Sequence, residues 1–301
     1  MSSQRILLIG PTGQVGWELQ RCVQPLGEVF TVGRAPTGVA QAFIDLSDPD
    51  SIRRVLREIK PTIILNAAAY TAVDKAEQES ELAHTINGTA PGILAEESLR
   101  LKSLLIHYST DYVFDGSHSQ PYTESDTVNP LGVYGTSKLA GEQAICAVGG
   151  QYFIFRTAWV YGLRGKNFLL TMQRLAKERD ELKIVADQIG APTWSQMIAQ
   201  ATALILAQLR SPLYSSDIEG LSGIYNLTSA GQTNWYEFAK AIIAQLDKQP
   251  RMLPITTADY PTPAKRPAYS VLSNTKLAQT FGISLPTWDK ALEICLTSDN
   301  A

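Results

Sequence analysis

Short, continuous apolar segments recur through the first half of the chain and alternate with segments of helical periodicity. The apolar segments are RILLIG (5–10), EVFTVG (28–33), TIILNAAA (62–69), SLLIHYST (103–110) and QYFIFRTAWVYG (151–162). Strands that are apolar on both faces are typical of a parallel sheet covered by helices on both sides. Because parallel crossovers are right-handed, we expect an α/β fold with a doubly wound parallel sheet.

The intervening segments have helical spacing of apolar residues or helix-start signals. We expect helices at 15–23, 47–60, 77–99 and 134–148, the third interrupted at Gly88 and Pro91. Beyond about residue 167 the alternation fades, and we expect helices at 168–177 and 196–209 and a strand at 223–229. The predicted division is a main domain at 1–165, to which part of 183–230 returns, and a smaller, discontinuous substrate-binding part mainly at 166–301.

Composition excludes several classes of protein. The 301 residues carry a net charge of -3 without a run of Lys or Arg, which argues against nucleic acid as a partner. The cysteines Cys22, Cys146 and Cys295 are odd in number and far apart, which favours a reducing compartment and no structural zinc. The first apolar segment is too short for a signal peptide or a membrane span. We therefore expect a cytoplasmic protein that does not bind membranes.

Glycines with the spacing GxxGxxG, at Gly10, Gly13 and Gly16, join the first expected strand to the first expected helix. Such glycines allow a tight turn and a close approach of the backbone to a pyrophosphate at the helix N-terminus. The pattern also fits an ordinary strand-to-helix turn. Its position favours dinucleotide binding.

The second expected strand ends at Gly33-Arg34, where an acidic residue would accept the adenosine ribose hydroxyls. An arginine suits a 2′-phosphate instead, through charge-assisted hydrogen bonds, although it could equally be a solvated surface residue. We expect NADPH as cofactor, with NADH as the alternative.

Tyr134 and Lys138 in VYGTSK (133–138) have the i, i+4 spacing that places two side chains on one face of a helix. A phenol has a pKa near 10, and a neighbouring ammonium group lowers it, so the pair can transfer protons. On spacing alone, an exposed helix pair is the more frequent explanation. Two strand ends favour catalysis: Ser109 and Thr110 offer hydroxyls to a substrate carbonyl, and Ala67–Ala69 leave room for a flat nicotinamide, although turn capping and packing explain these residues too.

These motifs resemble the extended short-chain dehydrogenase/reductase superfamily, whose fold is the Rossmann fold. Within it, GQVGWELQ, NAAAYTAVDKAE, STDYVFDG, YGTSKLAGE, RTAWVYG and GAPT together resemble the dTDP-4-dehydrorhamnose reductases. The similarity runs from about residue 5 to residue 193 and continues more loosely to the C-terminus. It implies hydride transfer from NAD(P)H to C4 of a 4-keto nucleotide sugar, which gives dTDP-L-rhamnose.

The resemblance also implies roles for single residues. Tyr134 would be the general acid, Lys138 its partner and a ligand of the nicotinamide ribose, and Thr110 the hydroxyl that orients the C4 oxygen. Expected cofactor contacts are Gly10, Gly13, Gln14, Val15, Gly16, Arg34, Asp45, Leu46, Ala69, Tyr70, Thr71, Tyr108, Tyr134 and Lys138. Expected substrate contacts are Thr110, Asp111, Tyr112 and Trp159. Trp159 is equally well explained as a core aromatic.

No metal is expected, since a tyrosine can supply the proton and the three histidines lack ligand spacing. Some members of the family bridge a homodimer with magnesium. Glu18 matches one ligand position, but Gln196 stands where another carboxylate is expected, which argues against the metal bridge.

Two rival functions remain at this point. One is a nucleotide-sugar epimerase or dehydratase of the same superfamily; Asp111 is compatible with a dehydratase, but Tyr112 stands where a dehydratase has a glutamate. The other is a non-catalytic subunit resembling the regulatory partner of methionine adenosyltransferase, which has no need of Thr110, Tyr134 and Lys138.

Overall fold

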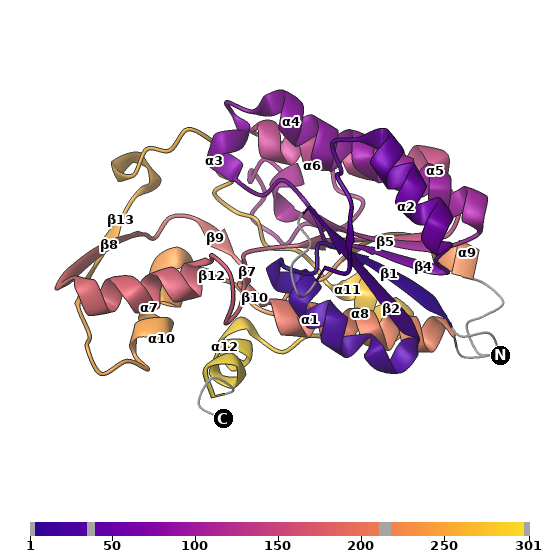
Figure 1. Cartoon of the computed structure of the whole chain (residues 1–301). Coiled ribbons are helices and arrows are strands. Elements are labelled where there is room, and N and C mark those ends of the chain that lie inside the picture. Colours follow the sequence, from indigo (N-terminus) through magenta and orange to yellow (C-terminus); the bar gives the residue numbers. More distant parts are fainter. Residues whose placement is uncertain (1–3, 35–39, 211–217, 298–301) are drawn as a thin grey trace.

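A seven-stranded parallel sheet is the centre of the protein (Figure 1). The computed structural model describes residues 4–34, 40–210 and 218–297. In spatial order the strands are β11 (Gly223–Asn226), β6 (Tyr152–Thr157), β5 (Leu104–Thr110), β4 (Ile63–Asn66), β1 (Arg5–Ile9), β2 (Glu28–Gly33) and β3 (Ala42–Phe43). The chain runs outward from β1 in one direction and then restarts at β4 on its other side. This confirms the doubly wound sheet, with its switch point between β1 and β4.

Helices cover both faces of this sheet (Figure 1). One face carries α1 (Gln14–Cys22), α8 (Ser195–Leu209) and α11 (Thr275–Phe281). The other carries α2 (Pro49–Ile59), α5 (Ala90–Leu101) and α6 (Val133–Val148). None of the described helices is long and apolar enough to span a lipid bilayer.

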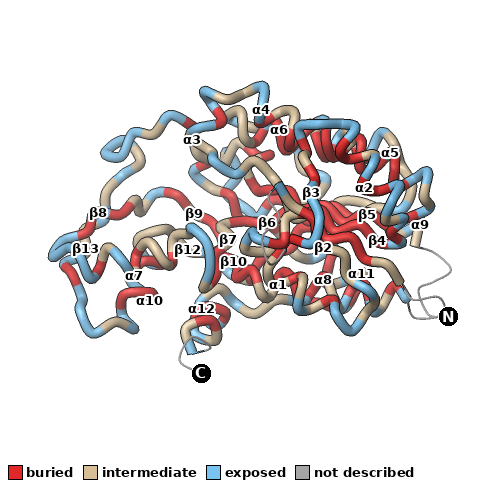
Figure 2. The backbone as a smooth tube through the Cα atoms, viewed as in Figure 1, coloured by how far each residue is buried: buried red, intermediate tan, exposed pale blue. Residues whose placement is uncertain are grey.

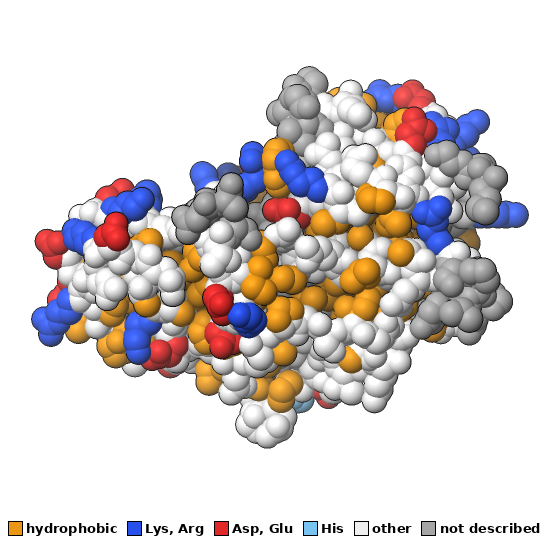
Figure 3. Space-filling model, turned by 90° about the horizontal axis from the view of Figure 1, so that it is seen from below, with side chains coloured by type: hydrophobic (Ala, Val, Ile, Leu, Met, Phe, Trp, Pro, Cys, Tyr) orange, Lys and Arg blue, Asp and Glu red, His pale blue; other side chains and the backbone are white. Residues whose placement is uncertain are grey.

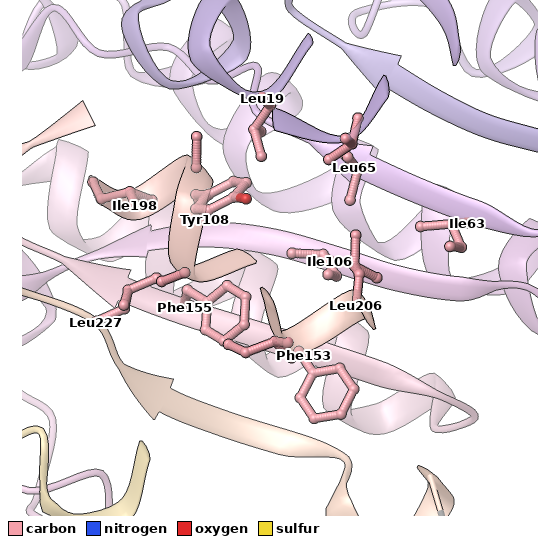
Figure 4. Packing of buried hydrophobic residues seen from close by; sticks show 14 of the residues in the cluster. Leu19, Ile63, Leu65, Ile106, Tyr108, Phe153, Phe155, Ile198, Leu206 and Leu227 are labelled. Carbon is pink, nitrogen blue, oxygen red and sulfur yellow. The ribbon is translucent and has the colours of Figure 1, made fainter. Parts of the chain in front are cut away.

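Successive residues of each strand enter separate cores, because side chains alternate between the faces of a sheet. Leu8, Leu65 and Ile106 pack against α1 and α8, in the cluster where Figure 4 shows Leu19 and Ile198. Their neighbours, among them Leu7 and Ile64, pack against α2 and α5 on the opposite side. The strands are therefore buried on both faces, as Figure 2 shows for the centre of the sheet.

The expected helix at 77–99 is divided by a π-helical turn, Thr85–Thr89. It follows α3 (Val73–Ala76) and α4 (Ser80–His84) and continues into α5, with the Ala90 N–H bonded to the Thr85 carbonyl five residues earlier. Pro91 has no N–H for the Asn87 carbonyl, so the ladder loses a bond there. Gly141 of α6 uses this site for close packing, since a Cβ on it would lie 2.1 Å from the Asn87 carbonyl oxygen.

The expected strand at 151–162 is broken after Thr157. Trp159 has a φ of +46°, which turns the chain, and β7 (Val160–Tyr161) pairs with β10 (Thr193–Trp194) outside the main sheet. The single long strand was therefore wrong.

A smaller body lies beside the sheet, at the left of Figure 1, around its own apolar core. Its elements are α7 (Phe168–Glu178), β8 (Glu181–Val185), β9 (Ile189–Gly190), β12 (Thr233–Asn234), α10 (Trp235–Ile243), β13 (Arg251–Ile255) and α12 (Trp288–Thr297). The short helix α9 (Ile218–Leu221) and the 3₁₀ turns Gln24–Leu26, Asp111–Val113 and Thr257–Asp259 complete the described elements. The strand expected at 223–229 is found as β11 and pairs with β6 in the main sheet. The proposed boundary at residue 165 stays a prediction.

Candidate active site

A cavity of about 930 Å³ opens at the C-terminal ends of β1, β2, β4 and β5. It spans the switch point between β1 and β4, where ligands bind in open α/β sheets. Its walls include Gly10, Gly13, Gln14, Val15, Arg34, Asp45, Leu46, Ala69, Tyr70, Thr71, Tyr108, Tyr134 and Lys138. These are all of the residues expected around the cofactor except Gly16. The buried hydroxyls of Ser109 and Thr157, in the same walls, have no hydrogen-bond partner among the described residues.

The glycine-rich turn needs its glycines for different reasons. Gly10 has a φ of +82°, and a Cβ there would lie 2.9 Å from the Ala68 Cβ. A Cβ on Gly16 would lie 2.0 Å from the Gly10 carbonyl oxygen, so this residue closes the turn and does not line the cavity. Gly13 precedes α1 without a side-chain cap, and its Cβ position is only lightly contacted. The N-terminus of α1 therefore presents backbone N–H groups to the cavity, which fits the pyrophosphate of a dinucleotide.

A loop at 162–167 closes over this turn, which the sequence did not reveal. The Asn167 amide donates hydrogen bonds to Gln14 Oε1 at 2.9 Å and to the Gly162 carbonyl at 2.8 Å. Lys166, beside Asn167, lines the cavity together with Gly165. Lys166 thus adds a cation to Arg34, Lys75 and Lys138 in the described cavity wall, and it comes from a segment more than a hundred residues from Arg34.

Arg34 and Asp45 lie in the wall of the cavity that follows β2 and β3. Hydrogen bonds from the Ser47 hydroxyl and N–H lower the pKa of Asp45, and the charge of Arg34 contributes in the same direction. Asp45 is therefore ionised and Arg34 lies close enough to influence it. The wall that follows β2 therefore carries an arginine together with a carboxylate, whereas a site for the ribose hydroxyls alone would carry only an acidic residue.

Tyr134 and Lys138 line the cavity together, one turn apart on α6. Burial raises the pKa of Tyr134 to about 12, Thr110 opposes this rise and Asp111 adds to it. The expected lowering of the phenol pKa by the lysine was therefore wrong for the protein alone. A raised pKa keeps the phenol protonated at neutral pH, which is the form that a general acid requires.

Lys138 is 1% exposed, which is rare for a lysine. Its Nζ donates a hydrogen bond of 2.6 Å to the Tyr108 carbonyl and lies 3.1 Å from His107 Nε2. Burial lowers the pKa of Lys138 to about 8, and the Glu142 carboxylate opposes this change. The Tyr108 hydroxyl shares a hydrogen bond with the Thr202 hydroxyl on α8, so the hydroxyl points toward that helix.

Three of the expected substrate contacts lie at the end of β5, next to Tyr134 and outside the cavity walls. The Thr110 hydroxyl donates to Asp111 Oδ1 at 3.0 Å and accepts from the Tyr112 N–H. The Tyr112 ring meets the Tyr134 ring edge to face at 5.6 Å between centroids. Burial raises the pKa of Asp111 to about 6, against opposing hydrogen bonds that include one from Ser270.

Trp159, the fourth expected substrate contact, lies apart from these residues. Its ring stacks on Trp235 with 3.5 Å between centroids, and a Cβ on Gly190 would run into it. Trp235 Nε1 donates to Gln188 Oε1. Trp159 therefore packs against the smaller body and does not line the cavity.

Asn87, in the π-helical turn, was missed by the sequence reasoning. Its Oδ1 accepts from the Tyr70 N–H at 2.8 Å, and its Nδ2 donates to the Tyr70 carbonyl and to Ser137 Oγ on α6. It joins the cavity wall at Tyr70 to the helix that carries Tyr134 and Lys138. A polar residue just before Gly88 and Pro91 was the available signal.

Within the described residues, no three His, Cys, Asp or Glu side chains gather as a metal-ligand group. Glu18 is half-buried beside Arg21 and Arg164, and burial raises its pKa.

The fold and the site together define an oxidoreductase of the extended short-chain dehydrogenase/reductase type. The chain belongs to the family described as RmlD substrate binding domain, whose model matches residues 4–300.

Relatives of known function bear out this assignment. A dTDP-4-dehydrorhamnose reductase of Burkholderia thailandensis is 48% identical over 97% of this chain and 98% of its own length. The Escherichia coli enzyme of the same name is 44% identical over 94% of each chain. A crystal structure of dTDP-4-dehydrorhamnose reductase from Bacillus anthracis in complex with NADP matches with a TM-score of 0.86 and 34% identity, over 98% of this chain and 99% of the other. The resemblance inferred from the motifs is confirmed.

Proposed function

We propose that this protein reduces the C4 keto group of dTDP-4-dehydro-L-rhamnose with NADPH and so forms dTDP-L-rhamnose. The observation that carries the proposal is one continuous cavity, which extends from the helix N-terminus at Gly13 to Tyr134 and Lys138. Its family membership and its reductase relatives support the choice of substrate.

The bound cofactor would supply a hydride, which adds to the C4 carbon of the sugar. Tyr134 donates its phenolic proton to the C4 oxygen, so that the product is a neutral alcohol. Thr110, whose hydroxyl lies beside the phenol, orients the same oxygen. Lys138 holds the ribose next to the nicotinamide and, when protonated, stabilises the phenolate that Tyr134 leaves. Asp111, Tyr112 and Trp159 remain the proposed substrate contacts.

A preference for NADPH is the second part of the proposal. Arg34 lines the cavity after β2, where a 2′-phosphate would accept its charge-assisted hydrogen bonds, and the similar B. anthracis enzyme was solved with NADP. We expect Arg34→Ala to raise KM for NADPH about tenfold or more and to leave KM for NADH nearly unchanged, since the loss is one charge-assisted contact. Equal effects on both cofactors would refute the assignment of Arg34.

The main test follows the absorbance of NADPH in the presence of dTDP-4-dehydro-L-rhamnose. We expect one NADPH to be consumed for each sugar reduced. Tyr134→Phe should lower turnover by ~10²–10⁴-fold, because a general acid is lost, and should leave cofactor affinity nearly intact. Tyr152→Phe is a matched control, since this half-buried tyrosine lies at the start of β6, away from the cavity.

The same assay separates the rivals. An epimerase or dehydratase would convert the sugar without net consumption of NADPH. A regulatory subunit would not oxidise NADPH at all. Absence of oxidation with every 4-keto sugar tried would sink the reductase assignment.

A homodimer also remains a proposal. The face that carries α1, α8 and α12 shows gathered hydrophobic side chains in Figure 3, and Leu204 of α8 is 55% exposed. Sedimentation at micromolar concentration, with and without magnesium, tests the dimer. We expect dimers in both conditions, since Gln196 stands at an expected carboxylate position.

A further inference from the structure

His107 lies behind the active-site lysine, between Lys138 and Asn66, wholly inside the protein. It is on β5 and is 1% exposed. Its Nε2 is 3.1 Å from Lys138 Nζ on α6, and its Nδ1 is 3.0 Å from the Asn66 side-chain amide on β4. Burial lowers the pKa of His107 well below its usual value, and the charge of Lys138 acts in the same direction. The imidazole is therefore neutral, with one nitrogen that donates and one that accepts.

The orientation of Asn66 decides which nitrogen does which. Asn66 Oδ1 accepts a hydrogen bond from the Ala68 N–H at 3.3 Å, so its NH₂ group points to His107 Nδ1. Nδ1 must then be the acceptor, and the hydrogen of the neutral ring must be on Nε2. This N–H points at Lys138 Nζ, which can accept it only as a neutral amine.

The opposite arrangement has a cost. A charged Lys138 would donate to His107 Nε2, which would place the ring hydrogen on Nδ1 and require Asn66 Oδ1 to face it. The Asn66 NH₂ group would then face the Ala68 N–H, donor against donor. A buried donor without an acceptor costs about 1–3 kcal/mol.

We propose that His107 is a positioning residue that, with Asn66, favours the neutral amine of Lys138, and that this chain of hydrogen bonds reverses when Lys138 is protonated. The inference rests on the proposed function only for its effect on the rate. It connects the backbone beside the nicotinamide position, at Ala68, to the lysine that assists Tyr134.

Further groups among the described residues face Lys138. Tyr134 and Glu142 flank it by one turn on α6, and β5 contributes the Tyr108 carbonyl. Glu142 favours the ammonium form, but it is bonded to the buried Arg156 of β6 through both of its carboxylate oxygens. His107 is therefore the neighbour that can either donate a hydrogen bond from Nε2 to Lys138 Nζ or accept one from it.

The first test is nitrogen NMR of the protein without cofactor, which reports the tautomer of each neutral histidine. The chain has three histidines, so His84→Gln and His118→Gln complete the assignment. At about one pH unit above the Lys138 pKa of about 8, we expect His107 to carry its hydrogen on Nε2. A hydrogen on Nδ1 at that pH would overturn the proposal. This measurement needs no activity, so its outcome is independent of the proposed reaction.

The second test is the pH dependence of kcat/KM. His107→Gln places an amide oxygen near the Nε2 position, and this oxygen accepts a hydrogen bond from the ammonium form of Lys138. Asn66→Asp places a carboxylate beside Nδ1 of His107, and this carboxylate accepts from a ring hydrogen on Nδ1, which leaves Nε2 as an acceptor for Lys138. Both variants should move the alkaline limb of the profile to higher pH by about one unit, because one buried hydrogen bond then favours the ammonium form of Lys138 instead of the neutral amine. His107→Gln adds no charge, which separates this effect from the direct field of an aspartate.

His84→Gln is the matched control, because it makes the same substitution on α4 outside the cavity walls, and its profile should coincide with the parent protein. A change in kcat/KM without movement of the limb in both His107→Gln and Asn66→Asp would show a purely structural role and would overturn the inference.

Discussion

Removing one charge from the ion pair beneath α6 should destabilise the whole protein. Arg156 of β6 and Glu142 of α6 are both buried, with a closest N–O distance of 2.7 Å. Arg156 Nε and Nη2 donate to the carboxylate, Nη1 has no partner among the described residues, and the guanidinium lies over the Phe114 ring. Glu142→Gln keeps the shape of the side chain but leaves the guanidinium buried without its counter-charge.

The expected loss follows from the burial of both partners. An uncompensated buried charge costs about 3–5 kcal/mol, against a total stability of about 5–15 kcal/mol for a typical domain. The melting temperature should fall by roughly 5–15 °C in a chain of this size. Exposed pairs behave differently: Arg174 and Glu178 are 60% and 51% exposed, and Glu178→Gln should change stability by less than about 0.5 kcal/mol.

The assay is urea unfolding followed by circular dichroism, with ΔG obtained from the midpoint and slope. A double variant, Glu142→Leu with Arg156→Met, tests the reasoning further. Since it removes both charges, it should recover most of the loss, and buried pairs replaced by apolar groups are often neutral or stabilising. A cost below about 1 kcal/mol for Glu142→Gln, or a double variant as unstable as the sum of its parts, would refute the reasoning.

Further predictions concern pH, the π-helical turn and the glycine-rich turn. Burial raises the pKa of Asp111 from 3.8 to about 6, so the folded state binds a proton that the unfolded state has released; stability should fall as pH rises from about 4 to 6, and Asp111→Asn should remove that part of the fall in urea titrations. Asn87→Ala loses its hydrogen bonds to Tyr70 and to α6, so kcat should fall by about tenfold or more while the melting temperature drops by a few degrees; an unchanged kcat would contradict the role of Asn87 in joining Tyr70 to α6. Gly16→Ala forces its Cβ against the Gly10 carbonyl, so calorimetry should detect no NADPH binding even if the protein folds, and normal affinity would contradict the role of this turn.

Much of the main sheet could be predicted, because each of its central strands is apolar on both faces and recognisable without its neighbours. The strands predicted at RILLIG, EVFTVG and SLLIHYST agree with β1, β2 and β5 to within one residue at each end. The break after Thr157 could not be predicted. Trp159 is held at positive φ beside Gly190 and Trp235, residues that are distant in the sequence, and no local pattern signals that contact.

The site shows the same division between local and long-range information. The spacing of Tyr134 and Lys138 and the glycines of the first turn are local, and all but Gly16 line the cavity. The protonation of the phenol is not local, because burial under the surrounding chain raises its pKa against the expected effect of the lysine. Lys166 was missed for a related reason, since the Asn167 side chain brings its loop to the glycine-rich turn.

The return of β11 to the main sheet limits how this protein can be divided or recombined. The late helices α8 and α11 supply one side of the core that Leu8 and Ile106 form, and Leu227 lies just after β11 in the same cluster. A fragment that ends at residue 165 would expose this side of the sheet to water. A chimera of two related proteins with a single junction near residue 165 would therefore exchange part of the main sheet and its helices together with the smaller body. A change of substrate in this family has to arise by substitution within the body, or by grafting at several junctions at once.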